Sequence, residues 1–451
     1  RELERQQQAD KAAAIATATA NVEAAKVAAL TMGEIWKDYV EKRRPFWGDL
    51  HYRDHVDKTK AGGLPSGRRG GGKQLTKPGP LAALTALPLN TLTAPVIEAW
   101  ADWTNANGGL GGHPVEVDIQ DTAGDPAKSQ TIIDEAIPKN PVLWLLDDPF
   151  TEASMSASLG ATGIPVMGLG YDPSIWGGHI EAFAMDCTPD ASNGLACALP
   201  NAFPLSATFG AVVDGPAFVA KSIGATKTVF AVCAEASSCS AAGPVWATTV
   251  AGLGMTDFGL TLISSSAADY TAECLSWIDA GVDFINMGVD GFAAAKIMAN
   301  CTEQGYTGAY SVSAGSVAGA LLQGTDNLVG TLNGFPWWVD DAPVVEYRSV
   351  MDGAGVDPEG YENPTATGIW AALQMFAKAN ATLSDAPTAA ETLANMYTIK
   401  DETLGGLVSP TTWTEGETAP PRNCWWNYSL TAGVLENPLG GLAYQCNPAA
   451  S

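Results

Sequence analysis

The sequence lacks several features that mark common classes of protein. No uninterrupted apolar run reaches the roughly 18 residues that a membrane-spanning helix needs. No C-x-x-C, H-E-x-x-H or G-x-S-x-G motif occurs, and the four histidines are scattered. These absences argue against a zinc site, a metalloprotease and a serine hydrolase, so we expect neither catalysis nor a cofactor.

Basic residues are scarce after residue 80. Residues 1–80 hold 15 Lys and Arg against 10 Asp and Glu, whereas residues 81–451 hold the other 9 basic and 39 acidic residues, a balance of −30. Such negative charge argues against binding of nucleic acid or an anionic membrane by the later part. A chain of 451 residues has room for two or three domains. The uneven charge indicates a composite of two segments with different origins.

Cysteine is absent before Cys187 and then occurs eight times. The number is even and neighbours lie close in sequence, which favours local disulfides formed in an oxidising compartment. Eight cysteines allow roughly a hundred connectivities, and buried free thiols are an alternative. Pairing by proximity gives Cys187–Cys197, Cys233–Cys239, Cys274–Cys301 and Cys424–Cys446.

Residues 1–92 are expected to form a basic, all-α segment. Residues 1–30 are rich in Ala, Glu, Gln and Lys, which favour helix, and they are too polar to be a secretory leader. A Gly- and Pro-rich basic loop follows at residues 60–80. Within it, Gly67 to Lys73 has the spacing of a phosphate-binding loop, but Gln74 stands where Ser or Thr is required. Nucleotide binding is therefore not expected.

From residue 93 onward, predicted helices and strands alternate. The stretch TAPVIEAWADWTNAN predicts an amphipathic helix, HPVEVDIQDT alternates like a strand, and DPAKSQTIIDEAI predicts a helix with Asp125 as its N-cap. Apolar runs such as PVLWLLDD and VDFINMGV are typical of strands in a parallel sheet. Repeated strand–helix units predict an α/β fold, in which ligands bind at the carboxyl ends of the strands.

Residues 93–451 resemble type I periplasmic solute-binding proteins, in the branched-chain amino-acid-binding branch of ABC importers. The stretches that carry the resemblance are WTNANGGLGGHPVEVDIQDTAGDPAKSQTIIDEAI, ATGIPVMGLGYDP and VDFINMGVDGFAAAKIMANCTEQGYTGAY, in the order that the family uses. The resemblance implies two α/β lobes, joined by three crossover strands, that close over a small solute. It assigns residues 93–210 plus 338–412 to the first lobe and residues 211–337 plus 413–451 to the second.

The resemblance also implies which loops contact the solute. Ala314 stands where amino-acid binders of this branch have a glutamate for the ligand's ammonium group, so a charge-assisted hydrogen bond is lost unless Asp290 replaces it. Trp337 and Trp338, at the expected crossover, are either core residues or the lining of an apolar pocket. The implied ligand-binding residues are Thr151, Ser154, Gly170, Tyr171, Glu235, Ser238, Asp290 and Ala314.

The leading hypothesis is therefore an extracytoplasmic solute-binding component of an ABC importer. The expected solute is amino-acid-like, an amide, or an aromatic or apolar molecule, and the expected partner is a membrane permease. The expected location is secreted, periplasmic or lipid-anchored, with any leader outside this chain.

Residues 31–100 resemble a second family, the helical core-binding segment of phage-type tyrosine recombinases. The stretch TMGEIWKDYVEKRRPFWGDLHYRDHVDKTKAGG is basic, as contact with a DNA backbone requires. The recombinase catalytic domain is absent, so weak DNA binding by residues 1–92 is an alternative function. Before Thr93 stands only PLAALTALPLN, without Val, Ile or alternation, so the first strand of a solute-binding lobe is predicted to be missing. A fusion near residues 90–103 that impairs binding is the third hypothesis.

Overall fold

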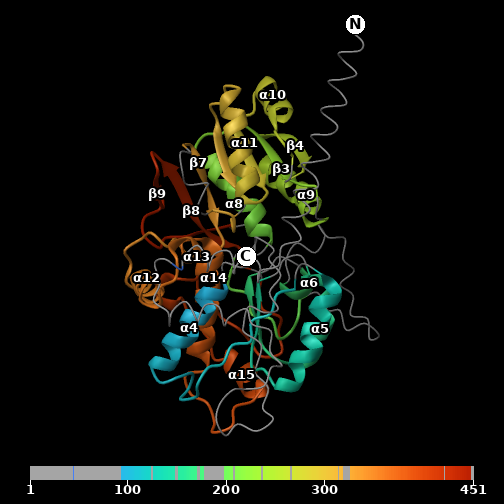
Figure 1. The fold of residues 1–451 in the computed structure, drawn as a ribbon. Coiled ribbons are helices and arrows are strands. Elements are labelled where there is room, and N and C mark those ends of the chain that lie inside the picture. Colours follow the sequence, from blue (N-terminus) through green and yellow to red (C-terminus); the bar gives the residue numbers. More distant parts are fainter. Residues whose placement is uncertain are drawn as a thin grey trace. The chain divides into compact units, whose positions relative to one another are not determined.

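Figure 1 shows the computed structural model, which describes Arg44 and most of the chain from residue 93 onward. The chain divides into two compact units, Arg1–Thr91 with Asp118–Ala123 and Leu92–Val117 with Gly124–Ser451. The helices predicted within residues 1–92 lie outside the described residues. From residue 93 the described ranges are 93–122, 125–147, 151–169, 173–176, 198–206, 209–234, 237–264, 267–312, 314–317, 326–420 and 422–447.

Helix α4 (Ala94–Ala106) begins the described part of the second unit, as the sequence predicts. Pro95 lies in its first turn, where the missing N–H costs no hydrogen bond, and Trp100 on its buried face is only 2% exposed. The turn that follows contains Gly109, with a φ of +79°. A Cβ at Gly109 would collide with the backbone of His113, so only glycine fits this position.

The strand predicted over HPVEVDIQDT is wrong, because no strand is formed between residues 114 and 122. Val115 bonds to a side chain instead. Its N–H donates to Asn105 Oδ1 over 2.6 Å, and its carbonyl accepts from Asn105 Nδ2 over 2.9 Å. An alternating pattern predicts a buried face but not a neighbour, and a strand needs a second backbone to satisfy its polar groups. Among the described residues, the side-chain amide of Asn105 satisfies the backbone N–H and carbonyl of Val115 instead of a neighbouring strand.

We expect Asn105→Ala to lower the free energy of unfolding by about 1–2 kcal/mol, because it removes both hydrogen bonds to Val115. Urea denaturation followed by circular dichroism measures the change. Asp102→Ala, at an exposed position of the same helix, is the matched control and should alter stability by less than about 0.5 kcal/mol. Equal losses in the two variants would contradict a structural role for the Asn105 amide.

The strands β1 (Trp144–Asp147) and β2 (Val166–Leu169) form a two-stranded parallel sheet. Among the described residues, β1 pairs with no other strand. The predicted N-cap of the helix before β1 is confirmed, since the Asp125 carboxylate accepts hydrogen bonds from two backbone amides in the first turn. The helical elements around this sheet are α5 (Pro126–Ala136), η2 (Ile137–Lys139), α6 (Glu152–Thr162) and α7 (Pro173–Trp176).

The remaining strands form an eight-stranded sheet in the order β10-β8-β7-β6-β5-β3-β4, with β9 paired to β8. The strands from β3 to β7 pair in parallel, whereas β8 runs antiparallel to β7. The predicted α/β class is therefore confirmed. The strands are β3 (Lys227–Cys233), β4 (Thr256–Ile263), β5 (Phe284–Gly288), β6 (Ala309–Val312), β7 (Leu328–Leu332), β8 (Cys424–Thr431), β9 (Val434–Glu436) and β10 (Gln445–Cys446).

Helices cover both faces of the eight-stranded sheet (Figure 1). Val229 of β3 packs with α10 and α11, whereas the next residue, Phe230, packs with α8 and α9. This change of partner follows from the two-residue period of a strand. The four helices are α8 (Phe209–Ser222), α9 (Ser237–Gly252), α10 (Thr271–Asp279) and α11 (Gly291–Glu303).

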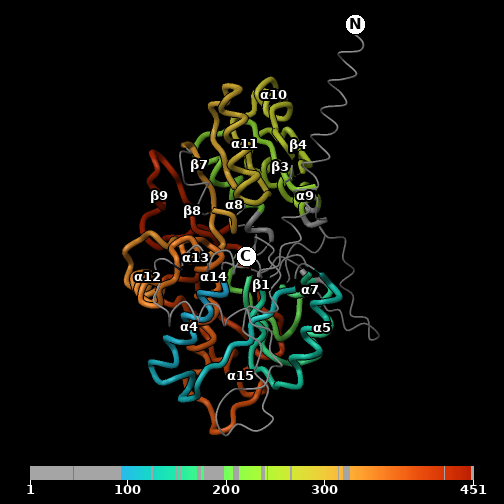
Figure 2. Tube along the Cα trace, viewed as in Figure 1, coloured from blue at the N-terminus to red at the C-terminus, as the bar shows by residue number. Residues whose placement is uncertain are grey.

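After β7 the chain leaves the eight-stranded sheet, forms further helices and then returns to it through β8, as the orange-to-red part of the trace in Figure 2 shows. Long-range pairing of this kind joins residues near 330 to residues near 428. The helical elements of the excursion are α12 (Ala342–Ala354), α13 (Pro358–Tyr361), α14 (Pro364–Ala379), α15 (Ala389–Met396) and η5 (Leu404–Gly406).

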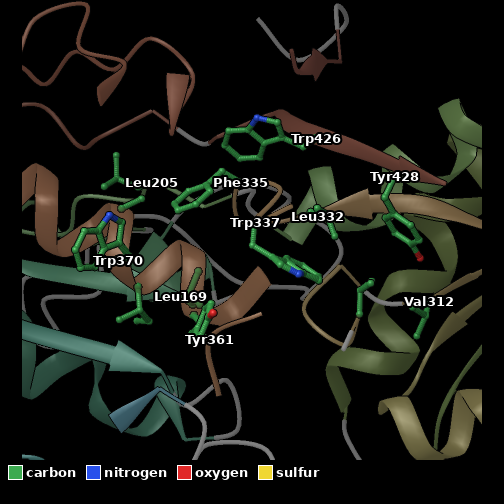
Figure 3. Packing of buried hydrophobic residues seen from close by; sticks show 14 of the residues in the cluster. Leu169, Leu205, Val312, Leu332, Phe335, Trp337, Tyr361, Trp370, Trp426 and Tyr428 are labelled. Carbon is green, nitrogen blue, oxygen red and sulfur yellow. The ribbon is translucent and has the colours of Figure 1, made fainter. Parts of the chain in front are cut away.

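One cluster of buried hydrophobic residues includes side chains from both sheets (Figure 3). Leu169 of β2 and Val312 of β6 belong to it, and Trp370 of α14 lies among its aromatic members. The Trp370 ring lies 5.7 Å from that of Trp103 and 5.3 Å from that of Tyr347, centroid to centroid. Helix α14 therefore packs against α4 and α12 through the largest side chain it has.

Three disulfides lie among the described residues, and each joins two cysteines that are neighbours in the sequence. Cys274–Cys301 connects α10 with α11, and Cys424–Cys446 connects β8 with β10. The third, Cys233–Cys239, connects the end of β3 to the first turn of α9. Cys187 and Cys197, the remaining pair proposed from the sequence, lie outside the described residues.

Candidate functional site

The carboxyl ends of β1 and β2 carry several polar side chains. Asp147, the last residue of β1, accepts a 2.7 Å hydrogen bond from the Thr93 hydroxyl, which stands directly before α4. Glu152, in the first turn of α6, is 1% exposed and accepts a 2.9 Å hydrogen bond from the Trp176 indole. The starts of α4 and α6 thus converge on the end of β1. This is the edge at which α/β folds bind ligands.

Two residues implied by the sequence lie at this edge. Thr151 precedes α6 as its N-cap and is 1% exposed. The Ser154 hydroxyl is on an exposed residue and donates to the Thr151 carbonyl over 2.6 Å. The Ser154 hydroxyl proton is therefore already used in a hydrogen bond, but its oxygen can still accept one from the solvent side. Gly170 and Tyr171, the other two residues implied here, lie outside the described residues.

The carboxyl end of β5 carries a polar residue and an exposed aromatic one. Asp290 caps α11, because its Oδ1 accepts hydrogen bonds from Phe292 N (2.9 Å) and Ala293 N (3.1 Å). The Phe292 side chain is 75% exposed, more than any other large hydrophobic residue that the structure describes. This exposed ring lies at the carboxyl edge of the parallel sheet, where a ligand could contact it.

The other implied residues have different surroundings. Ala314 is 1% exposed and follows β6, and the carbonyl of the next residue, Gly315, accepts a 3.3 Å hydrogen bond from Thr365 on α14. The end of β6 is thereby joined to a helix outside the eight-stranded sheet. Ser238 lies in the first turn of α9, inside the span of the Cys233–Cys239 disulfide. Glu235 lies outside the described residues.

Of the two tryptophans at the crossover, one is a core residue and the other lines a cavity. Trp337 is 3% exposed and belongs to the core, whereas Trp338 is half-buried and lines a surface cavity. The two rings meet edge to face, with centroids 4.8 Å apart. Arg348 of α12 holds the segment, since its guanidinium donates to the carbonyls of Trp337 (2.6 Å) and Val339 (2.7 Å).

Two tyrosines beside the crossover act as neutral donors. The Tyr347 hydroxyl donates to the Tyr361 carbonyl over 2.7 Å, and the Tyr361 hydroxyl donates to Asp352 Oδ1 over 2.7 Å. Burial raises the pKa of Tyr347 well above its ordinary value. Burial also raises the pKa of Tyr361, and its bond to Asp352 raises it further. Both phenols therefore keep their protons at neutral pH and stabilise the packing of α12 and α13.

Sequence reasoning missed Glu152, Trp176 and Phe292. The signal for Phe292 was present, because an aromatic residue two positions after a strand-ending Asp falls at the carboxyl edge of the sheet. Nothing in the sequence marks the bond between Glu152 and Trp176, which depends on how α6 and α7 pack. No group of three His, Cys, Asp or Glu side chains in the described ranges is arranged to hold a metal ion.

Solved structures of similar fold are solute-binding proteins. A substrate-binding periplasmic protein from Ralstonia solanacearum is 16% identical, with a TM-score of 0.61 over 77% of this chain and 95% of that one. An ABC-transporter solute-binding protein from R. palustris in complex with benzoate is 14% identical, with a TM-score of 0.60 over 80% and 94%. A substrate-binding protein from Aeropyrum pernix is 14% identical, with a TM-score of 0.63 over 80% and 93%. At these identities the likeness concerns the fold.

Family models match two parts of the chain. The phage integrase core-binding domain matches residues 31–109, which agrees with the resemblance of the basic segment. No curated protein gives a significant match to the chain. The periplasmic binding protein model matches residues 81–433, which is most of the sequence and includes every strand of the two sheets except β9 and β10. The chain therefore belongs to the periplasmic binding protein family.

Proposed function

We propose that this chain is the extracytoplasmic solute-binding component of an ABC importer. The observation that carries the proposal is the convergence of polar helix starts on the carboxyl ends of parallel strands in two sheets, at Thr151 in one and Asp290 in the other. Solutes bind at such edges in α/β folds. The proposed lobes are residues 93–210 plus 338–412 and residues 211–337 plus 413–451, and the return of β8 to pair with β7 supports this division.

The proposed solute is aromatic or apolar, with an amide as a further option, rather than an α-amino acid. A buried alanine at position 314 offers no charge to an ammonium group. Asp290 is already engaged by two backbone amides of its own helix, which makes it a weak substitute for the missing glutamate. Phe292 supplies an apolar ring at the same edge. The benzoate bound by the R. palustris protein is a sensible first probe.

The proposed site uses Phe292 as a solute contact, together with Thr151, Ser154, Gly170, Tyr171, Glu235, Ser238, Asp290 and Ala314. Ring-to-ring contact with an aromatic solute contributes about 0.5–1.5 kcal/mol beyond the area buried. The proposed activity is binding without catalysis. The proposed location is outside the cytoplasm, which three disulfides in the described part support. No helix in the described ranges is long and apolar enough to cross a membrane, and the proposed partner is a membrane permease.

Ligand-induced stabilisation of the full chain tests the proposal. A solute present at 100 times its dissociation constant should stabilise the protein by about 2.7 kcal/mol, because it binds only the folded state. A thermal-shift panel of benzoate, benzamide, phenylacetate and leucine should rank the aromatic compounds first. Phe292→Ala should weaken binding of the best aromatic compound roughly tenfold without loss of stability.

Phe258→Ala is the matched control for this panel, because Phe258 is also exposed, at 38%, but lies near the start of β4, away from the carboxyl edge. It should leave solute affinity unchanged. If no compound in a wide panel stabilises the protein at millimolar concentration, the solute-binding proposal is wrong for this chain. If a solute binds equally well to both variants, Phe292 has no part in the site.

DNA binding by residues 1–92 is the second candidate function, favoured by the match of residues 31–109 to the phage integrase core-binding domain. An electrophoretic shift on random-sequence duplex should appear at low salt and disappear as salt rises, because contacts to phosphate release counterions. Residues 93–451 alone, with their strong negative charge, should give no shift. The absence of a shift for the full chain at low salt would rule this function out.

A further inference from the structure

A surface cavity is formed by residues other than those assigned to the proposed solute site. It has a volume of about 530 Å³ and lies between the segment Trp338–Asp341, which follows β7, and the segment Leu435–Gly441, which begins in β9. Its size is within the range of small-molecule sites, about 300–1,000 Å³, and it is a depression that is largely open to solvent. None of the described residues assigned to the solute site lines it. The residues that line it are Trp338, Val339, Asp340, Asp341, Leu435, Glu436, Asn437 and Gly441.

Both walls of this cavity are fixed by hydrogen bonds. Arg348 holds one wall through the two carbonyls already described and through a 2.9 Å ion pair with Asp340. On the other wall, Asn437 Nδ2 donates to the carbonyls of Gly441 and Ala443, both at 2.8 Å. Gly441 has a φ of +50°, and a Cβ there would stand 3.0 Å from Asp341 Oδ2. The absence of a side chain at Gly441 lets the two walls approach each other.

The lining combines three carboxylates with one aromatic side chain. Within the described ranges, Asp340 is the one carboxylate of the three with a cationic partner, Arg348, which also donates to two carbonyls of the same wall. Asp341 and Glu436 form no ion pair with any residue that the structure describes. No Lys, Arg or His among the described residues lines the cavity. A ligand that complements the charge of this lining is therefore a cation.

Trp338 is the aromatic residue of the lining. It is partly buried against the core and lines the cavity together with Val339 and Leu435. The face of an indole attracts a cation through its quadrupole, most strongly for weakly hydrated organic cations such as quaternary ammonium groups. Carboxylates near such a ring add a longer-range attraction that salt screens.

We propose that this cavity binds an organic cation, with the charged group against the Trp338 ring and the Asp341 and Glu436 carboxylates, and the apolar part against Val339 and Leu435. A ligand held here contacts both the segment that leaves the eight-stranded sheet after β7 and the segment that begins in β9. The site differs in composition from the proposed solute site, because the two share no described residue.

Calorimetric titration of the full chain with choline tests the proposal, and 3,3-dimethylbutan-1-ol is the neutral analogue of the same shape. Choline should bind saturably and lose affinity at high salt, and the neutral alcohol should bind roughly tenfold more weakly. Trp338→Leu should weaken choline binding roughly tenfold and Glu436→Gln roughly threefold. Asp385→Asn, an exposed carboxylate outside the cavity, and Phe292→Ala should leave the affinity unchanged.

Three results would overturn the proposal: no saturable binding of choline, equal binding of the neutral alcohol, or wild-type affinity in both Trp338→Leu and Glu436→Gln. Loss of choline binding in Phe292→Ala would show that choline binds at the proposed solute site. The proposal of a separate cation site would then also be wrong. Glu436 is exposed, so its substitution keeps the test valid if Trp338→Leu fails to fold. An NMR contact between the choline methyl protons and the Trp338 indole is expected in the wild type.

Discussion

Trp370→Ala is expected to lower the free energy of unfolding by about 3–5 kcal/mol, the largest effect of any single substitution considered for this chain. Trp370 is 1% exposed, and its ring contacts those of Trp103 on α4 and Tyr347 on α12. Removing the indole leaves a cavity at the point where three helices meet, and rigid neighbours on all sides cannot close it. The variant therefore loses both the burial of the ring and the contacts of its neighbours.

Urea denaturation followed by far-ultraviolet circular dichroism measures this loss without depending on tryptophan fluorescence. Trp370→Phe is the graded control, since it keeps most of the apolar volume and should cost less than half as much as the alanine variant. Phe292→Ala is the control for an exposed ring and should fall within about 0.5 kcal/mol of the wild type. A loss below about 1 kcal/mol for Trp370→Ala would mean that α4 and α12 are not held by α14 as the structure shows.

Removal of the Cys274–Cys301 disulfide by the double substitution Cys274→Ala and Cys301→Ala should cost about 3–4 kcal/mol. The two cysteines are 27 residues apart, and the cross-link restricts the unfolded chain by an entropy that grows with the length of the closed loop. Both side chains are at most 1% exposed and lie between α10 and α11, so alanine also leaves small voids there. Chemical denaturation under non-reducing conditions gives the size of the loss.

The Cys233–Cys239 disulfide offers an internal comparison. Its cysteines are only 6 residues apart, so the same entropic argument gives about 2 kcal/mol for Cys233→Ala with Cys239→Ala. The long-loop pair should therefore be the costlier one to remove. A reversed order would show that loop entropy is not the main contribution of these cross-links.

Local signals in the sequence were sufficient for most elements of the second unit. The helix over α4 follows from its apolar spacing and Pro95, and α5 follows from the cap at Asp125. The apolar runs that became β1 and β5 were recognisable because both faces of a parallel strand are buried. In each case the deciding interactions lie within about one turn of helix or within the strand itself.

The segment HPVEVDIQDT shows where local signals fail. Its alternation is as good as that of any strand in the chain, yet Val115 bonds to the Asn105 side chain and no strand forms. A strand is defined by its neighbour, and the neighbour comes from a distant part of the chain. The residues before Thr93 had already been predicted to lack strand character, and among the described residues no strand stands beside this segment.

In the candidate site, too, some features could be predicted from local signals and others depend on distant contacts. The sequence placed Asp290 at the end of a strand, but only the structure shows that its carboxylate caps α11 and that Phe292 beside it is exposed. For Trp337 and Trp338 the sequence left two alternatives open, and burial assigned one residue to the core and the other to a cavity. Two adjacent tryptophans therefore have different roles, because Trp337 is packed within the core and Trp338 is only partly covered.

The sequence by itself determined the α/β class, the family, the acidic character and most helices and strands, because these depend on period, composition and residues close together in the chain. The tertiary structure decided which strands exist, how β8 returns to β7, which carboxylates are engaged and where a cavity opens beside Trp338. Those features depend on contacts between residues tens to hundreds of positions apart, and burial and hydrogen-bond satisfaction at such contacts are set only when the chain is packed.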